Sequence, residues 1–168
     1  MIKNINFLFV TFFGVGTIRY APGTVTSLIT TVFLFSSFHI LNLPKSTILI
    51  LLIVIFFYAF IAIADYIKDS SNKDPKEIVI DEVIGQSIPI YLYEVAHGTT
   101  KESKEAILFY IYIFILFRFY DIKKPFPINF FDQKFKNSFG VIMDDVIAGF
   151  YVILTLILFM IIKSKLFI

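Results

Sequence analysis

The 168-residue chain has no cysteine, no tryptophan and only two histidines, and only 17% of its residues are charged. Without cysteine it can have neither a disulfide framework nor a thiolate metal site. Soluble domains carry about 25% charged and about 45–50% apolar residues. Here the hydrophobic fraction is 58% and the mean hydropathy is +0.83. The shortage of charge argues against an ordinary soluble domain and indicates a membrane protein.

The net charge of +2 is too small to indicate a nucleic-acid partner. The length suits one domain, so we expect residues 1–168 to form a single membrane-embedded unit. The apolar run 5–15 lacks a clean small-x-small cleavage site after it, which argues against a cleavable signal peptide. That run is too short to span a bilayer and is expected to lie in the interface or against the bundle.

Five segments are predicted to cross a bilayer, because a crossing helix needs about 20 mostly apolar residues. They are residues 24–43, 47–67, 78–94, 105–120 and 139–162. Lipid forces a spanning backbone into helices or closed barrels, and the long apolar runs exclude the alternating pattern of barrel strands. The predicted fold class is all-α, an integral membrane helical bundle with about five crossing helices.

Lysine and arginine predict the orientation, because cytoplasmic loops are enriched in them. If all five segments cross and the N-terminus is inside, ten of the 15 basic residues lie inside. These ten are Lys3, Arg19, Lys68, Lys73, Lys76, Arg118, Lys123, Lys124, Lys134 and Lys136. If residues 78–94 did not cross, the basic loop 118–138 would lie outside instead.

Four polar clusters fall at the ends predicted to face the cytoplasm. They are residues 14–24, the Asp81-Glu82 pair, residues 118–125 and the Asp144-Asp145 pair. Buried acids are costly at such depths and usually face a bundle interior with a partner. We therefore expect the acids to meet in one pocket, although acids at helix ends can also simply face the wet interface.

Two features of the paired acids favour a metal site. Asp81 precedes Gly85 by four residues and Asp145 precedes Gly149 by four, so each carboxylate shares a helix face with a glycine. Such a glycine lets another helix or a phosphate come close. Adjacent acids also repel each other in a low-dielectric interior unless a cation offsets their charge. An oxygen-rich site of this kind suits Mg²⁺ or Mn²⁺.

The neighbouring basic residues indicate phosphate chemistry. Arg118 and Lys124 are placed to grip a phosphate whose charge the metal would offset. Because Pro125 restricts the residue before it, Lys124 is expected to have an extended backbone and to point into the pocket. Lys123 is expected to contact lipid head groups.

Three other polar residues are candidates by type for the acidic site: Asp65, His39 and His97. Asp65 ends a predicted span and is a further candidate for the acidic set. His39 and His97 are both predicted to lie away from the acids, so neither is expected to take part.

At these clusters the sequence resembles the phosphatidylglycerophosphatase A family. The matching stretches are residues 14–28, 73–86 and 117–150, and the last combines FRFYDIKKPFPI with GVIMDDVIAG. The resemblance implies Mg²⁺-dependent hydrolysis of phosphatidylglycerophosphate, a step of phospholipid biosynthesis, to phosphatidylglycerol and phosphate. It also implies a multi-pass protein of the bacterial inner membrane whose active site faces the cytoplasm.

Carried over by position, the resemblance implies roles for eight residues. The catalytic set is Asp81, Asp121, Asp144 and Asp145, the substrate-binding set is Arg118, Lys124 and Thr24, and the metal set is Asp81, Glu82, Asp121, Asp144 and Asp145. Thr26-Ser27 and Lys123 depart from the family's usual residues, which affects the fine geometry and leaves every acid in place. Direct attack by water and a phosphoaspartate intermediate are both compatible with this set.

Other classes fit the residues less well. A phosphatase with a histidine nucleophile needs a well-placed histidine, a haloacid-dehalogenase-type enzyme needs Asp-x-Asp on a strand, and CDP-alcohol phosphotransferases use a longer Asp-x-x-Asp-Gly pattern. A small membrane carrier or channel that binds a cation is the alternative from another class, and it would place its acids near the midplane on broken helices. A non-catalytic subunit would not need four converging polar clusters.

Overall fold

The computed structural model describes residues 2–68, 75–97 and 103–166, and their regular structure is entirely helical. The elements are α1 (Ile2–Val10), the 3-10 turn η1 (Val15–Thr17), α2 (Pro22–Phe35), the π-helical turn η2 (Ser36–Ile40), α3 (Lys45–Ile67), α4 (Ile80–His97), α5 (Ser103–Lys123), α6 (Ile128–Lys134) and α7 (Ser138–Leu166). The all-α prediction is confirmed.

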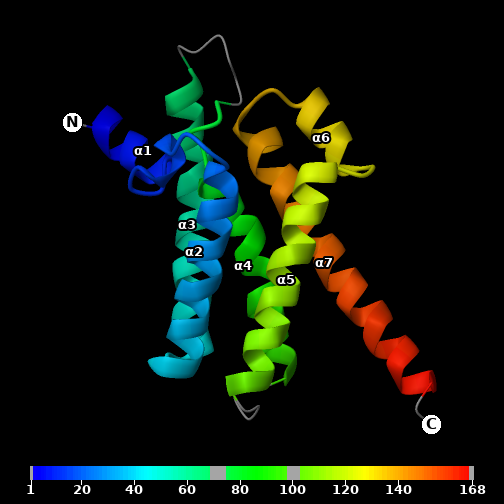
Figure 1. Ribbon diagram of the computed structural model, residues 1–168. Coiled ribbons are helices and arrows are strands. Elements are labelled where there is room, and N and C mark those ends of the chain that lie inside the picture. The colour runs from blue at the N-terminus through cyan, green and yellow to red at the C-terminus, as the bar shows by residue number, and fades with distance from the viewer. Residues whose placement is uncertain (1, 69–74, 98–102, 167–168) are drawn as a thin grey trace.

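Helices α2, α3, α4, α5 and α7 run between the two ends of the bundle in alternating directions (Figure 1). The starts of α2, α4 and α7 and the ends of α3 and α5 lie together, at what we call the upper end. Three described helical segments are long and apolar enough to cross a membrane: Pro22–Ile40, Lys45–Ile67 and Ser138–Lys165. The predicted number of about five crossing helices is therefore larger than the number that meets this criterion.

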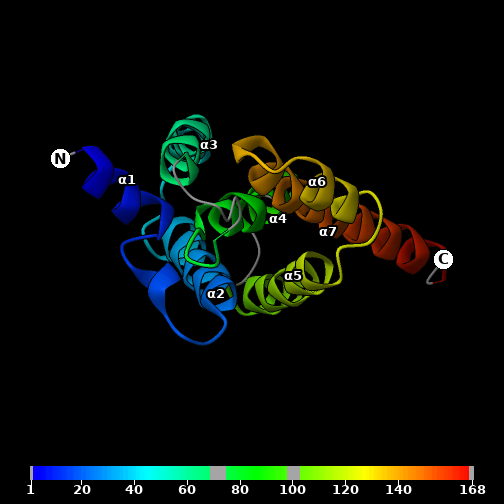
Figure 2. The same cartoon turned by 90° about the horizontal axis from the view of Figure 1, so that it is seen from above.

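Helix α4 does not meet this criterion because it is too polar, and its central position in the bundle explains why it can be. Seen from above, α4 lies between α2 and α3 on one side and α5 and α7 on the other, and it contacts all four (Figure 2). Its polar residues Asp81, Gln86, Ser87 and Glu94 are all buried. A helix enclosed by other helices presents little surface to lipid, so it can carry polar side chains that a lipid-facing helix cannot.

The outer surface is apolar where a membrane would contact it. On α3, Ile50, Val54, Phe57 and Ile61 recur at helical spacing and are each 60–65% exposed. Ala59 on the opposite face of the same helix is fully buried. An exposed apolar stripe of this length is typical of a lipid-facing helix.

Two glycines let α4 and α7 cross closely. A Cβ atom placed on Gly149 would lie 2.6 Å from the Gly85 carbonyl oxygen, and one on Gly85 would lie 2.6 Å from the Asp145 carbonyl oxygen. Small residues at a crossing are the usual means by which membrane helices approach each other. The glycines after the paired acids thus make room for a neighbouring helix, and neither lines the acidic pocket.

Helix α1 packs against α3 through a polar contact that includes Asp65. The Asn6 amide donates to Asp65 Oδ2 at 2.7 Å, and the Tyr58 hydroxyl donates to Asn6 Oδ1 at 2.8 Å. The expectation that the run before Gly14 packs on the bundle is met. Asp65 holds this helix in place and does not line the acidic pocket.

Candidate functional site

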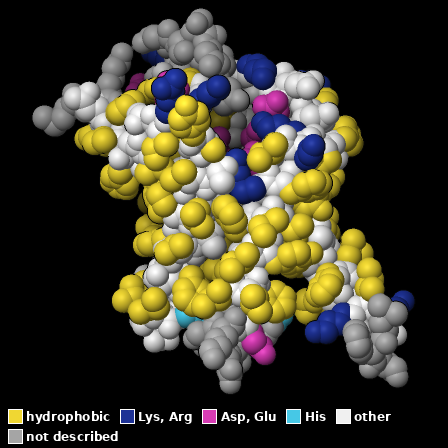
Figure 3. All heavy atoms as spheres, viewed as in Figure 1, with side chains coloured by type: hydrophobic (Ala, Val, Ile, Leu, Met, Phe, Trp, Pro, Cys, Tyr) yellow, Lys and Arg dark blue, Asp and Glu magenta, His cyan; other side chains and the backbone are white. Residues whose placement is uncertain are grey.

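A hollow of about 340 Å³ opens at the upper end, where α2, α4 and α7 begin and α5 ends. All eight residues selected from the sequence line it: Thr24, Asp81, Glu82, Arg118, Asp121, Lys124, Asp144 and Asp145. In the space-filling view, acidic and basic side chains gather at this end while the sides of the bundle are largely apolar (Figure 3). The expectation that the acids meet in one pocket is confirmed.

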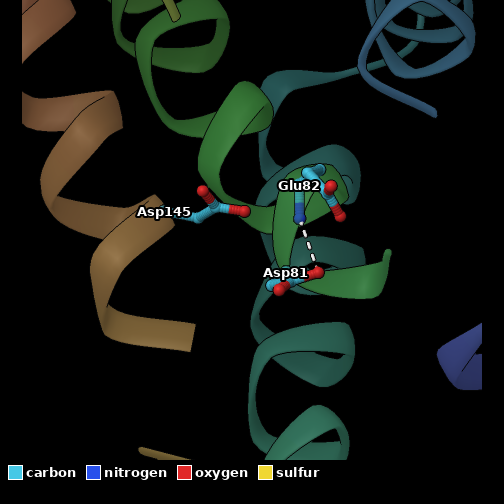
Figure 4. Close-up of side chains that lie close together, drawn as sticks. All are labelled: Asp81, Glu82 and Asp145. Atoms are coloured by element: carbon cyan, nitrogen blue, oxygen red, sulfur yellow. Dashed lines mark hydrogen bonds between the residues drawn. The ribbon is translucent and has the colours of Figure 1, made fainter. Parts of the chain in front are cut away.

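Three of the acids lie closest together. One carboxylate oxygen from each of Asp81, Glu82 and Asp145 lies within 4.8 Å of the other two. The Asp145 side chain extends from α7 toward the first turn of α4, which carries the other two acids (Figure 4). The Glu82 amide donates to Asp81 Oδ1 at 3.1 Å, which fixes the Asp81 carboxylate against its own helix. Both aspartates are less than 9% exposed and Glu82 is partly buried, so three carboxyl groups are crowded together in a largely buried place.

Gly23 makes room for this trio from the side of α2. A Cβ atom there would collide with Glu82 Oε1 and would lie 3.2 Å from Arg118 Nη1. Helix α2 begins at Pro22 after Ala21, whose φ is 47°, and no side chain caps its first turn. The first amides of a helix lack partners within that helix and attract anions. Gly23 and Thr24, at the uncapped start of α2, line the hollow beside the acids.

Arg118 reaches the hollow from the last turns of α5. Its Nη1 atom lies 2.6 Å from Asp121 Oδ2, one turn later, and 3.4 Å from Ser27 Oγ on α2. Its Nε atom is buried and has no hydrogen-bond partner among the described residues. Asp121 thus holds the guanidinium in place, and part of the donor set is left for another acceptor.

Lys124 lies between two carboxylates just beyond the end of α5. Its Nζ atom is 2.7 Å from Asp144 Oδ2 and 2.9 Å from Asp132 Oδ1. Burial alone would lower the pKa of Lys124, but the charges and hydrogen bonds of Asp144 and Asp132 outweigh it and raise the pKa above its ordinary value. The ammonium group therefore stays protonated.

The backbone of Lys124 differs from the sequence-based expectation. Its φ is 42°, in the left-handed region, where an extended conformation was expected from the following proline. The chain leaves α5 by this turn, and the Lys124 amide still donates to the Tyr120 carbonyl at 2.8 Å. The side chain nevertheless points into the hollow, as expected, and Lys123 is exposed.

Asp132 is a charged partner that the sequence analysis missed. It belongs to α6, a seven-residue helix inside the stretch interpreted as the loop 118–138. Helix α6 packs against α7 and brings Asp132 back to Lys124. The eight-residue separation of Lys124 and Asp132 carries no helical or strand periodicity, so only the folded loop reveals the pair.

The two histidines lie away from these acids, as expected. His39 Nε2 is 3.0 Å from Glu94 Oε1, in the last turn of α4 at the opposite end of the bundle, and His97 follows in that turn. The five predicted metal ligands differ in their partners: Asp81, Glu82 and Asp145 face one another, whereas Asp121 and Asp144 are paired with basic side chains.

Comparisons with known proteins identify the family of this chain. A family model described as Phosphatidylglycerophosphatase A matches residues 8–160. Phosphatidylglycerophosphatase A of Haemophilus influenzae is 34% identical over 142 residues, which is 84% of this chain and 80% of that protein. A Bacteroides thetaiotaomicron protein with the provisional name phosphatidylinositol-3-phosphatase is 32% identical over 142 residues, 83% of each chain.

A shorter match covers part of the Escherichia coli K12 Phosphatidylglycerophosphatase A, at 34% identity over 82 residues, 49% of this chain and 42% of that protein. No solved structure matches the chain significantly. The family model spans most of the chain, including every residue of the acidic hollow. The chain belongs to the phosphatidylglycerophosphatase A family.

Proposed function

We propose that this membrane protein is a lipid phosphatase that hydrolyses phosphatidylglycerophosphate to phosphatidylglycerol and inorganic phosphate. The observation that carries the proposal is one hollow at the end of a membrane bundle that joins Asp81, Glu82 and Asp145 to Arg118 and Lys124. Family membership and the name of the Haemophilus influenzae relative support the choice of substrate.

The donor set of the hollow fits a divalent cation, and we propose Mg²⁺. Five carboxylates but only three basic side chains line the hollow, which leaves an excess of negative charge. Glu82 Oε2 is buried and has no hydrogen-bond partner among the described residues. Asp81, Glu82 and Asp145 would hold the ion, because carboxylate oxygens suit Mg²⁺. When bound, such an ion offsets charge on phosphate oxygens and makes water a better nucleophile.

The basic residues would bind the phosphate, and their acidic neighbours would hold the basic side chains in position. Arg118 and Lys124 would bind the phosphate oxygens through charge-assisted hydrogen bonds. Lys124 has three N–H donors and its two carboxylate partners use two, so one donor is left for the substrate. Asp121 positions Arg118 in the same way that Asp132 and Asp144 position Lys124. Donors fixed in this way need little rearrangement during the reaction.

The reaction itself breaks the bond between phosphorus and the terminal glycerol oxygen. A water oxygen becomes bonded to phosphorus, and one water proton ends on the glycerol oxygen. A carboxylate of the trio accepts the proton from the attacking water or, in the alternative, attacks phosphorus first and is then released by water. In both cases the products are phosphatidylglycerol and inorganic phosphate.

The upper end of the bundle is proposed to face the cytoplasm of a bacterial inner membrane. Among residues whose side chains the structure describes, eight basic residues lie toward this end: Arg19, Lys68, Lys76, Arg118, Lys123, Lys124, Lys134 and Lys136. Lys45, Lys163 and Lys165 lie toward the other end. Enrichment of basic residues on the cytoplasmic side supports this orientation.

A second candidate substrate is phosphatidylinositol 3-phosphate, because the Bacteroides thetaiotaomicron relative has the provisional name of a phosphatase for it. Both lipids carry a phosphomonoester on a polyol head group. The alternative of a cation carrier is less well supported, because the acids lie at the helix ends and not near the middle of the bundle.

Phosphate release by the purified protein in detergent–lipid micelles tests the proposal. We expect release from phosphatidylglycerophosphate in the presence of Mg²⁺ and its loss on chelation. Phosphatidylinositol 3-phosphate under the same conditions shows which lipid is preferred. Absence of release from both lipids, with the protein folded and Mg²⁺ present, would contradict the proposal.

A further inference from the structure

A second hollow of about 330 Å³ adjoins the acidic one and contains no member of the acidic trio. It is lined by residues 16–19 of the segment before α2, by Phe7, and by Pro22, Lys76 and Glu77. Lys76 and Pro22 line both hollows. The two hollows therefore lie next to each other at the start of α2, with Lys76 and Pro22 between them.

The second hollow carries two basic side chains that the proposed hydrolysis does not use. Arg19 and Lys76 line it and are both exposed. Glu77 is the acid on this hollow, and the Tyr66 hydroxyl donates to its Oε1 atom at 3.4 Å. The described residues of this lining therefore carry a net positive charge, in contrast to the acidic hollow beside them.

Backbone packing brings together the two segments that carry Arg19 and Lys76. A Cβ atom on Gly16 would collide with the Glu77 carbonyl oxygen, so the turn before Arg19 lies directly against the residue after Lys76. The Val79 amide donates to the Val10 carbonyl at 2.9 Å and ties the same two segments together. The fold thus holds the backbone segments that carry Arg19 and Lys76 beside each other.

The surface around Arg19 suits the boundary between lipid and water. Phe13 is 81% exposed, Tyr20 is 75% exposed and Ile18 is 44% exposed. Exposed aromatic and basic residues together are typical of the head-group level of a membrane. An anion bound by Arg19 would therefore lie where the phosphodiester of a lipid lies.

We infer that Arg19 and Lys76 form a subsite for the phosphodiester of the lipid substrate, while its terminal phosphomonoester lies in the acidic hollow. This inference rests on the proposed function. A phosphatidylglycerophosphate molecule has two phosphates separated by one glycerol unit, and the two adjoining hollows provide a positive site beside the proposed metal site. The subsite selects phosphomonoesters that carry a second, esterified phosphate.

Two short-chain substrates test the subsite. Dioctanoyl phosphatidylglycerophosphate has both phosphates, and 1-O-octylglycerol 3-phosphate has the same phosphomonoester with an ether in place of the diester. The quantity to compare is kcat/KM for the first substrate divided by kcat/KM for the second. This ratio should fall about five-fold in Arg19→Gln and about five-fold in Lys76→Gln, mainly because KM for the first substrate rises. Arg19→Lys should keep most of the ratio, because it keeps the charge.

The control is Lys134→Gln. Lys134 is also exposed and basic but lies over the Phe130 ring on α6 and lines neither hollow. Its substitution should leave the ratio unchanged. An unchanged ratio in the Arg19 and Lys76 variants would overturn the inference. An equal fall in the Lys134 variant would do the same, because it would indicate only a diffuse positive surface.

A binding measurement separates this inference from the proposed reaction. Calorimetric titration of the chelated wild-type protein with the two-phosphate lipid should give a dissociation constant that rises about five-fold in Arg19→Gln. If the wild type binds this lipid in that way but releases no phosphate with Mg²⁺, the hydrolysis proposal fails and the subsite stands. If it hydrolyses the lipid but Arg19→Gln binds as tightly as the wild type, only the subsite fails.

Discussion

Lys124 connects the basic and acidic parts of the hollow, because its ammonium group contacts Asp144 and Asp132 and also lines the cavity. Lys124→Ala should raise KM for phosphatidylglycerophosphate and lower kcat, since a fixed charge stabilises both the bound phosphate and the transition state. Removal of one such preorganised donor costs about 2–4 kcal/mol of transition-state stabilisation. Steady-state kinetics in mixed micelles at fixed Mg²⁺ measures both constants.

Lys123 provides the matched comparison, because it is the preceding residue and is exposed. Lys123→Ala should change kcat/KM by about five-fold or less, the value of one charge near a membrane surface. Equal losses in the two variants would mean that the loop supplies only a general positive field.

Helix α4 carries polar residues at both ends. One set lines the acidic hollow, and the other forms a hydrogen-bond network with neighbouring helices. Its first turn holds Asp81 and Glu82, which face the hollow. Its last turns hold Glu94, whose Oε1 atom accepts a hydrogen bond from the Tyr110 hydroxyl at 3.0 Å and lies 3.0 Å from His39 Nε2. The Lys45 ammonium donates to the Glu94 backbone carbonyl. This network joins the lower ends of α3, α4 and α5 with the η2 turn.

Tyr110→Phe should therefore destabilise the fold without reducing the chemistry at the upper end. The loss should be about 1 kcal/mol, since hydrogen bonds between membrane helices contribute about that much or less. Unfolding in detergent measures it, with Tyr112→Phe as control, because Tyr112 is 37% exposed and lies outside the network. If Tyr110→Phe is as stable as the wild type but loses activity, the network has another role.

The bounds of the two most apolar helices were predictable, because a long apolar run largely determines them. The predicted segment 47–67 corresponds to helix α3, Lys45–Ile67, and the predicted segment 139–162 corresponds to helix α7, Ser138–Leu166. The convergence of the acids was also predictable, since alternating helices bring their ends to one side of the bundle. The paired acids at 81–82 and 144–145 therefore meet at the upper end.

The contacts made by particular side chains were not predictable in this way. The Lys124–Asp132 pair depends on the fold of α6, and the His39–Glu94–Tyr110 network joins residues up to 71 positions apart in the printed sequence. The sequence around Gly23 does not reveal that the absence of a side chain there makes room for Glu82 and Arg118. Local periodicity carries none of this information, because each contact depends on how whole helices pack.

The orientation of the whole bundle can be tested by labelling, because the chain has no native cysteine. Lys134 near the upper end and Ser164 near the lower end are both exposed and can each be replaced by cysteine. An impermeant maleimide added to intact spheroplasts should label the Ser164→Cys variant, whereas the Lys134→Cys variant should need permeabilisation. The opposite pattern would place the acidic hollow outside the cytoplasm.

The substitution Asp145→Asn tests directly whether the carboxyl groups of Asp81, Glu82 and Asp145 perform the hydrolysis. Asparagine has nearly the same shape, and removing one of several close negative charges should leave the fold as stable or more stable. Phosphate release from phosphatidylglycerophosphate at saturating Mg²⁺ should fall by about 100-fold or more, because a proposed metal ligand and its charge are lost. We predict a folded protein, checked by thermal unfolding in detergent, that is almost inactive. A folded Asp145→Asn variant with near-normal phosphate release would contradict the account.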